Sequence, residues 1–98
     1  VYNMEFKSFN KVDWVRFDKL AAKYGKYNAK LMIQKRAKLG WTKEMLIESI
    51  GRPNDINRSF GSWGTHEQWV YREYSSEFNE YITEYYYFEN GFLTTIQD

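Results

Sequence analysis

Residues 81–97 read YITEYYYFENGFLTTIQ, two runs of alternating side chains on either side of Asn90 and Gly91. Asn-Gly is the strongest short signal for a two-residue hairpin turn, because both turn positions need a positive φ. Side chains alternate between the two faces of a strand. One face of the first run would hold Tyr81, Thr83, Tyr85 and Tyr87, and the other Ile82, Glu84, Tyr86 and Phe88. This stretch therefore predicts two paired antiparallel strands.

The same period of two begins soon after Pro53. Residues 56–60 (INRSF) and 66–73 (HEQWVYRE) predict two further strands, joined across GSWGT, whose two glycines permit a tight turn. Residues 73–80 (EYSSEFNE) predict a longer, polar hairpin connection to the third strand. The four strands would form an antiparallel meander.

Before this sheet, the apolar residues have the spacing of helices. Apolar residues recur at intervals of three and four, a pattern typical of one helix face, at Phe17, Leu20, Tyr24, Tyr27 and Leu31. Asp13 is the expected N-cap. Gly25 is unfavourable inside a helix, so we expect two helices, over 13–24 and 27–36.

The stretch LGWTKEMLIESIGRP predicts a third, short helix with clear ends. Thr42 would cap its N-terminus, and Trp41 before the cap would pack on Leu46 as a hydrophobic staple. Gly51 supplies the stop and Pro53 prevents the helix from resuming. Two to three helices packed on one face of a four-stranded antiparallel meander give an α+β fold.

Length and composition fit one domain over residues 1–98, with residues 1–12 irregular or an N-terminal extension. Aromatic residues make up 20% of the chain, enough for a modest core built from large side chains. The sequence contains no cysteine, which excludes disulfides and thiolate chemistry. It contains no run long and apolar enough to span a membrane, and its first residues do not resemble a signal peptide.

Charge is divided between the two halves of the chain. Residues 1–52 carry twelve Lys/Arg and five Asp/Glu, whereas residues 53–98 carry two Arg and eight acids. The basic helices would either face an anionic partner or pack beside the acidic sheet, and we favour the second interpretation. A sheet of stacked aromatics can read single-stranded RNA, but here the aromatic half is acidic. The basic stripe lies on the helices instead, at Lys19, Lys23, Lys26 and Lys30, which argues against nucleic acid.

Groups for catalysis are few. His66 is the single histidine, and its neighbour Glu67 would point to the opposite face of the strand. Four glutamates of the second half lack the Asp/Asn/Gly loop spacing of a cation site: Glu77, Glu80, Glu84 and Glu89. We therefore expect no enzymatic activity, no cofactor, no metal and no small-molecule substrate.

Two large apolar residues stand where turns are expected. Trp63 lies between two glycines, and Phe78 lies in the polar hairpin connection. Apolar groups at loop tips usually have a covering partner. We therefore expect both residues to contact another protein.

Four motifs in order resemble the SmpA/OmlA-type domain of the small lipoprotein subunit of the bacterial outer-membrane β-barrel assembly machinery. Uncharacterised bacterial envelope proteins of that group are the more similar members. The resemblance covers residues 27–97. Its motifs are Gly40-Trp41-Thr42, Ile50-Gly51-Arg52-Pro53, Glu67-Gln68-Trp69-Val70-Tyr71 and Tyr87-Phe88-Glu89-Asn90-Gly91-Phe92-Leu93.

This resemblance implies two helices on a short antiparallel sheet, related to β-lactamase-inhibitor-protein repeats. It implies scaffolding or protein binding in the cell envelope or periplasm, with membrane attachment only through an anchor outside this chain. The sequence departs from the family in its longer connection from Tyr74 to Glu80 and in lacking the lipid-bearing N-terminal cysteine.

Three hypotheses follow. The first is a protein-binding or structural domain of the envelope, contacting its partner through Trp63 and Phe78, with the sheet around Trp69, Tyr87 and Phe88 holding these tips. The second is an enzyme inhibitor that inserts the 74–80 hairpin into a cleft. The third is a cytosolic nucleic-acid-binding module that uses the basic helices.

Overall fold

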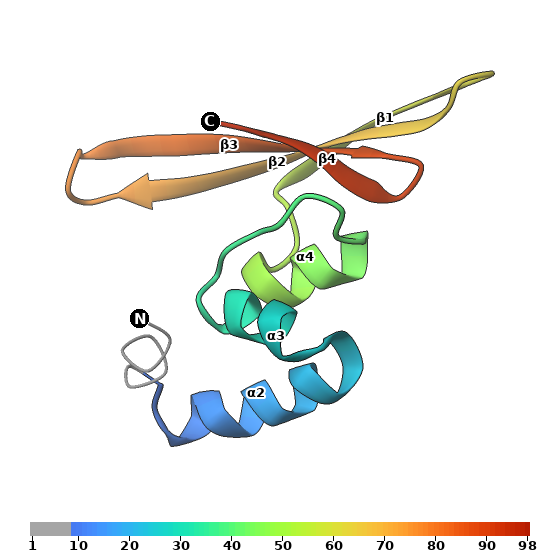
Figure 1. Cartoon of the computed structure of the whole chain (residues 1–98). Coiled ribbons are helices and arrows are strands. Elements are labelled where there is room, and N and C mark those ends of the chain that lie inside the picture. Colours follow the sequence, from blue (N-terminus) through green and yellow to red (C-terminus); the bar gives the residue numbers. More distant parts are fainter. Residues whose placement is uncertain (1–8) are drawn as a thin grey trace.

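The structure is a computed structural model, and it describes residues 9–98. Helices α2 (Lys11–Tyr24), α3 (Lys26–Ile33) and α4 (Lys43–Ile50) come first. Strands β1 (Asp55–Gly61), β2 (Gly64–Ser75), β3 (Glu80–Glu89) and β4 (Phe92–Gln97) follow (Figure 1). The predicted α+β class, with helices preceding an antiparallel sheet, is confirmed.

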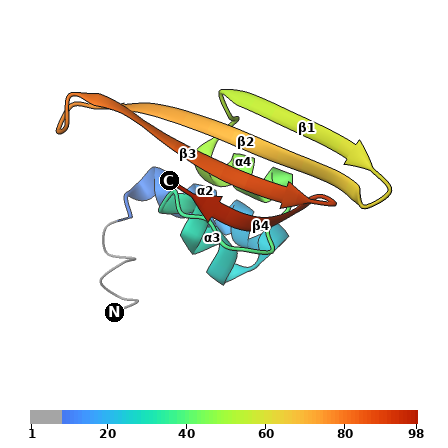
Figure 2. The ribbon, with the colours of Figure 1, turned by 90° about the horizontal axis from the view of Figure 1, so that it is seen from above.

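The four strands form one antiparallel sheet in the order β1-β2-β3-β4, the predicted meander. The helices all lie below one face of this sheet, with α4 nearest to it, α3 next and α2 farthest (Figure 1). Viewed from above, the helices sit under the middle of the sheet, and its hairpins reach past them (Figure 2). The sheet therefore has one partly covered face and one open face.

Helix α2 begins earlier than predicted. Asn10, not Asp13, is its N-cap: the Asp13 amide donates to Asn10 Oδ1 at 2.8 Å, and the Asn10 amide donates to Asp13 Oδ2 at 3.1 Å. Asp13 therefore takes the third helical position of a capping box, which places its carboxylate in the first turn as well. The expected irregular segment 1–12 thus ends before residue 11, and residues 1–8 lie outside the described part of the chain.

The break between the first two helices is where Gly25 predicts it. Gly25 has φ +89° and serves as the C-cap of α2 and the N-cap of α3. Helix α3 ends at Ile33, earlier than expected, because Lys35 takes a positive φ of 56° that no helix continues through.

Both predicted ends of α4 are confirmed. The Thr42 hydroxyl accepts from the Met45 amide at 3.3 Å, and Gly51 ends the helix with φ +85°. Trp41 and Leu46 are both buried in the core, as the staple predicts. The Trp41 indole N–H donates to Asn28 Oδ1 at 2.9 Å, so this buried donor is satisfied by α3.

Strand pairing confirms the predicted faces of β3. Trp69 pairs with Tyr86 and Glu67 with Phe88, so these residues share the helix-side face. Gln68 pairs with Tyr87, which puts both on the open face. Asn90 and Gly91 form the β3–β4 turn with φ of 51° and 89°, as the Asn-Gly pair predicts.

The predicted long β2–β3 connection over 73–80 is wrong. Tyr74 pairs with Tyr81 and Ser75 with Glu80, so the turn occupies residues 76–79 alone. The two tyrosine rings meet edge to face with centroids 5.3 Å apart, and Asn79 supplies a positive φ of 53°. These cross-strand contacts extend the ladder through a stretch whose polar composition suggested a loop.

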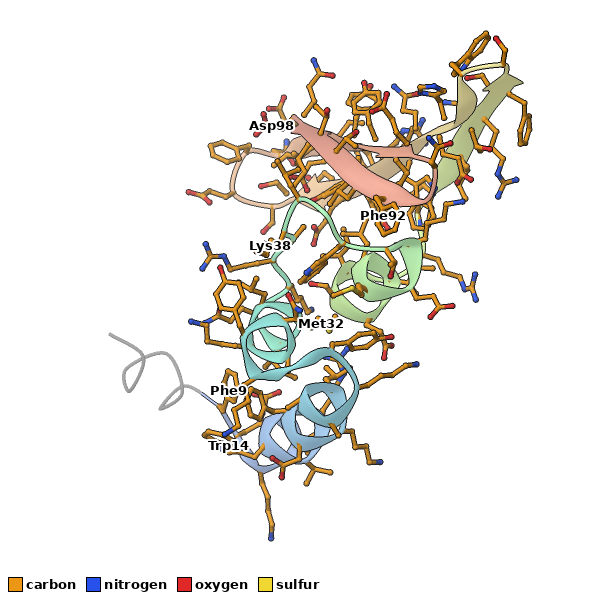
Figure 3. All side chains as sticks on the ribbon, turned by 45° about the vertical axis from the view of Figure 1, so that its right-hand side comes forward. Phe9, Trp14, Met32, Lys38, Phe92 and Asp98 are labelled. Atoms are coloured by element: carbon orange, nitrogen blue, oxygen red, sulfur yellow. The ribbon has the colours of Figure 1, made fainter. Side chains whose placement is uncertain are left out.

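The core lies between α4 and the middle of the sheet. Trp69 and Phe88 are buried with ring centroids 4.7 Å apart, and Leu93 packs in the same cluster. A second part of the cluster joins the helices, where Met32 of α3 lies between α3 and α4 (Figure 3). At the outer edge of α2, the rings of Phe9 and Trp14 meet at 5.2 Å.

The segment before α4 is hydrogen-bonded to the edge of the sheet. The Gly40 amide donates to the Leu93 carbonyl at 2.7 Å, and the Leu93 amide donates to the Trp41 carbonyl at 2.8 Å. Thr42 then forms an isolated antiparallel bridge with Phe92. These bonds cover the start of β4 and hold α4 beneath the sheet.

Leu46→Ala is expected to lower the free energy of unfolding by about 2–5 kcal/mol, because it leaves a cavity where α4 meets the sheet. Leu46 is fully buried, whereas Leu39 is 55% exposed, so Leu39→Ala is the matched control and should cost less than about 0.5 kcal/mol. Urea denaturation of both variants measures the difference. Equal losses would contradict this placement of the core.

Candidate functional site

A buried carboxylate stands at the helix-side face of β2. Glu67 is 5% exposed. Lys43, the first residue of α4, forms an ion pair with Glu67 Oε2, and Arg58 Nε of β1 lies 3.4 Å from the same oxygen. The Trp69 indole N–H donates to Oε1 at 2.8 Å. Both carboxylate oxygens are therefore occupied by donors from three elements.

These partners decide the ionisation of Glu67. Burial alone raises the pKa of a carboxyl, but the hydrogen bonds from Lys43 and Trp69 and the charges of Lys43 and Arg58 outweigh it. The pKa of Glu67 is therefore lowered from its ordinary value, and the group is a fixed anion. This arrangement suits a structural ion cluster, because no oxygen is left to bind a ligand.

His66 does not join this cluster. It points to the open face, where its Nδ1 lies 3.3 Å from Glu89 Oε1, while Glu67 points to the helices. The expected separation of His66 and Glu67 is confirmed by the strand geometry. Within residues 9–98, no group of three acidic or histidine side chains is placed to hold a metal ion.

Tyr71 ties the sheet to the end of α4. Its hydroxyl donates to the Gly51 carbonyl at 2.8 Å, and burial raises its pKa well above the ordinary value. The family-like motif residues Gly51 and Tyr71 therefore contact each other. A second hydrogen bond connects β2 to the segment that follows α4, because Asn54 Oδ1 accepts from the Arg72 amide at 2.7 Å.

Trp63 and Phe78 are both exposed at turns, by 61% and 62%. They lie at opposite ends of the sheet, because Trp63 precedes β2 and Phe78 follows it (Figure 1). A strand rises about 3.3 Å per residue, so the 12 residues of β2 span about 40 Å. The two residues thus belong to separate surfaces.

Trp63 is folded back onto the open face. A Cβ atom on Gly61 would lie 2.2 Å from its indole ring, so only glycine leaves room beneath it. The indole also lies 6.0 Å from the His66 ring, centroid to centroid. Trp63 is therefore an oriented platform on the sheet.

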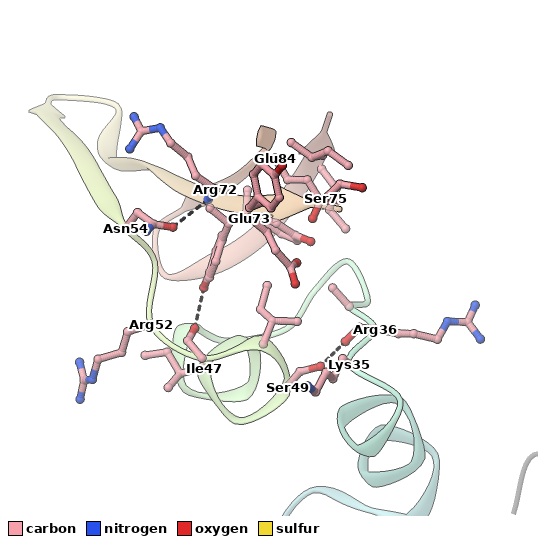
Figure 4. A pocket seen from close by; sticks show the side chains of 18 of the residues that line it. Lys35, Arg36, Ile47, Ser49, Arg52, Asn54, Arg72, Glu73, Ser75 and Glu84 are labelled. Carbon is pink, nitrogen blue, oxygen red and sulfur yellow. Dashed lines mark hydrogen bonds between the residues drawn. The ribbon is translucent and has the colours of Figure 1, made fainter. Parts of the chain in front are cut away.

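A cleft lies below the overhanging β2–β3 hairpin. Its volume is about 1310 Å³, and it is bounded by the C-terminal end of α4, the segment after α3, and the uncovered strands (Figure 4). Ile82 and Ile96 of the sheet and Ile47 and Ile50 of α4 give it an apolar centre. Ile82 and Ile96 are partly exposed, because no helix reaches them.

Charges of opposite sign line the two walls of this cleft. The helical wall carries four cations and one acid, whereas the sheet and its β2–β3 turn carry three acids and one cation: Arg16, Lys35, Arg36, Arg52 and Glu48 on the first, Glu73, Glu77, Glu84 and Arg72 on the second. Arg36 and Arg52 extend outward at the rim, and Glu73 reaches down from the sheet (Figure 4). The cleft therefore offers an apolar floor between a cationic rim and an anionic rim.

The predicted basic stripe is interrupted. Lys19, Lys23 and Lys26 are exposed, but Lys30 is buried with its amine 5.8 Å from the Tyr27 ring. The stripe also crosses the break at Gly25 between two helices. Its exposed part is shorter than the sequence spacing indicates.

The chain matches no protein-family model, no curated protein and no solved structure. The resemblance to the SmpA/OmlA-type domain therefore stays a prediction. Of the helices between residues 9 and 98, none has the length and hydrophobicity needed to cross a membrane.

Sequence reasoning missed the Glu67 cluster and the cleft. Glu67 lies two residues before Trp69, on the face that alternation assigns to the core, and this was the available signal. No pattern in the sequence indicated the cleft, because the cleft depends on where α4 ends beneath the sheet.

Glu67→Gln is expected to lower the free energy of unfolding at pH 7 by about 1.5–3 kcal/mol, because the charged hydrogen bond with Lys43 and the ion pair with Arg58 are lost. A lowered carboxyl pKa stabilises the fold above the unfolded value near 4.5 and ceases to do so as pH falls through the folded value. The wild type should therefore lose more stability than the variant on acidification from pH 6 to pH 3.

Urea denaturation across this pH range measures both effects. Glu77→Gln, in the exposed β2–β3 turn, is the control and should change the stability at pH 7 by less than about 0.5 kcal/mol. Parallel acid profiles for the wild type and Glu67→Gln would show that the cluster contributes nothing.

Proposed function

We propose that this chain is a non-enzymatic protein-binding domain and that the cleft below the β2–β3 hairpin receives its partner. The observation that carries the proposal is the uncovered helix-side face of the hairpin around Ile82 and Ile96. Exposed apolar surface gathered in a hollow and rimmed by charge is typical of interaction sites.

The size of the cleft favours a polypeptide. Small-molecule pockets usually enclose about 300–1000 Å³, and this open cleft of about 1310 Å³ is larger. A partner segment with apolar residues along its centre would cover Ile82 and Ile96. Acidic residues on one side of that segment would meet Arg36 and Arg52, and basic residues on the other would meet Glu73 and Glu84.

Phe78 extends this surface at the tip of the same hairpin. The hairpin is stiffened by the Tyr74–Tyr81 ring contact and by a hydrogen bond from the Tyr74 hydroxyl to Asn79. A rigid tip loses little conformational freedom on binding, which favours affinity. Of the two tips, Phe78 is therefore the one we assign to the partner-binding surface.

The compartment we propose is the bacterial cell envelope, and its support is the resemblance to the SmpA/OmlA-type domain. Catalysis gains no support from the ionisable side chains that the structure brings together. Lys43 and Arg58 are both paired with the buried carboxylate of Glu67. A binding or scaffolding role requires none of these groups to react.

Site-specific photo-crosslinking in the cells that produce the protein tests the site. Benzoylphenylalanine placed at Ile82 should give a discrete crosslinked product, whereas the same group at Val12, exposed on α2, should not. Glu73→Lys should reduce the Ile82 product several-fold, and Asp18→Lys on α2 should leave it unchanged, because attraction at the cleft rim falls only in the first variant. Equal products from both positions, or none from Ile82, would overturn this assignment.

Enzyme inhibition is the second candidate function, favoured by the same projecting hairpin with 62% of Phe78 exposed at its tip. An inserted tip residue would fill an enzyme pocket, and its removal should weaken inhibition at least tenfold. A panel of secreted hydrolases, assayed with the wild type and Phe78→Ala, measures this. Absence of inhibition at micromolar concentration would contradict the inhibitor hypothesis and leave the binding hypothesis intact.

A further inference from the structure

The open face of the sheet carries a second hollow, away from the cleft. A groove of about 730 Å³ crosses this face and is lined by residues of all four strands. Its centre is a row of polar side chains, one from each strand: Asn57, Gln68, Tyr87 and Gln97. We call this set the amide row.

Hydrogen bonds join the amide row from edge to edge. Asn57 Nδ2 donates to Gln68 Oε1 at 2.9 Å, and Gln68 Nε2 donates to the Tyr87 hydroxyl at 3.0 Å. The Tyr87 hydroxyl then donates to Gln97 Oε1 at 3.0 Å. All donors point in one direction along the chain of bonds, so each amide is held in a defined orientation.

Each amide in the row keeps hydrogen-bonding capacity for a ligand. An amide side chain has two N–H donors and an oxygen with two lone pairs. Gln68 uses one donor and one lone pair within the row, Asn57 uses one donor, and Gln97 uses one lone pair. Each of the three amides therefore keeps at least one donor and one acceptor, which suits ligands whose hydroxyl groups both donate and accept.

The ionisable side chains that line the groove lie in pairs. His66 Nδ1 lies 3.3 Å from Glu89 Oε1 on this face. Arg58 and Glu67 also contribute lining atoms, but their charged ends meet on the helix side of the sheet. Among the residues that line the groove no lysine occurs, so a phosphate or sulfate would find no unpaired cation here.

An aromatic platform stands beside the groove. The Trp63 indole lies over Gly61 on the open face and 6.0 Å from the ring of His66, a groove residue. Trp63 is 61% exposed. Because Gly61 has no Cβ, the indole ring has room to lie over it in this orientation. An oriented aromatic face attracts flat apolar groups whose hydrogens carry partial positive charge.

We propose that the amide row and Trp63 form a binding site for a neutral oligosaccharide. The C–H face of one sugar ring stacks on Trp63, while the hydroxyl groups of the following rings pair with the amides of Asn57, Gln68 and Gln97. The row is ordered before binding, so little side-chain freedom is lost. This site lies on the face opposite the cleft and does not depend on the proposed partner.

Nuclear magnetic resonance titration tests the site with two neutral probes, cellotetraose and chitotetraose. Saturable shifts of the Trp63 indole and of the Asn57, Gln68 and Gln97 side-chain amides, with a Kd of about 1 mM or tighter for at least one probe, are expected. A heparin tetrasaccharide supplies the charged comparison and should bind at least tenfold more weakly. No shifts at 10 mM of either neutral probe, or tighter binding of the heparin fragment, would overturn the proposal.

Two variants and a matched control locate the binding. Trp63→Ala and Gln68→Ala should each raise the Kd for the bound probe at least fivefold. Phe78→Ala removes an aromatic side chain of the same exposure at the opposite end of the sheet and should leave the Kd unchanged. Unperturbed backbone amide spectra outside the substituted region establish that each variant is folded. Binding that survives both groove variants, or that falls in Phe78→Ala, would contradict the assignment.

This pattern also separates the two proposals. Trp63→Ala should weaken sugar binding at least fivefold without changing the Ile82 crosslink, whereas Glu73→Lys should reduce the Ile82 crosslink several-fold without changing the Kd for the sugar probe. Either proposal can therefore fail alone.

Discussion

The helical layer is too short to cover the sheet, and most features of the molecule follow from this mismatch. Helix α4 has eight residues and is about 12 Å long, whereas β2 has 12 residues and spans about 40 Å. Only the middle of the sheet can therefore pack on a helix, and there the core holds Trp69, Phe88 and Leu93 with Leu46 below. The remainder of the helix-side face has to be solvated, charged or covered by another molecule.

The two ends of the sheet meet this constraint differently. Near the β1–β2 end, the ion cluster of Glu67, Lys43 and Arg58 closes the edge of the core. The carboxylate of Glu67 loses its hydration here, whereas the Lys43 and Arg58 side chains stay 36% and 54% exposed, so the two cations compensate the buried anion while they keep contact with water. Lys43 is the first residue of α4, so the pair fixes which end of the helix lies under β2. At the β2–β3 end no such cluster forms, and Ile82 and Ile96 stay exposed above the cleft.

Local signals in the sequence predicted much of this fold because they act within a few residues. Asn90 and Gly91 placed the last turn, and Thr42 and Gly51 placed the ends of α4, since positive φ and capping are properties of single positions. Alternation along β3 assigned its two faces correctly. Where two residues compete for one role the same reasoning failed, as for Asn10 and Asp13, which both belong to one capping box.

Features that depend on distance in space were not predictable in this way. The β2–β3 turn was expected to be long because its residues are polar, whereas a contact between Tyr74 and Tyr81 continues the ladder. The cleft depends on the length of α4 relative to that of β2, a separate element later in the chain. Opposite placement of Trp63 and Phe78 at the two ends of β2 follows from the meander itself.

The register of β3 places the two proposed sites one residue apart. Tyr86 lines the cleft on the helix side, and Tyr87 is the centre of the amide row on the open face. A shift of one residue would exchange these side chains and would put a polar row against the core. The buried pairs Trp69–Tyr86 and Glu67–Phe88 prevent that shift, because they hold the core and the ion cluster in the same register. The core and the Glu67 cluster therefore stabilise the fold and, through the alternation of β3, also set the chemistry of both surfaces.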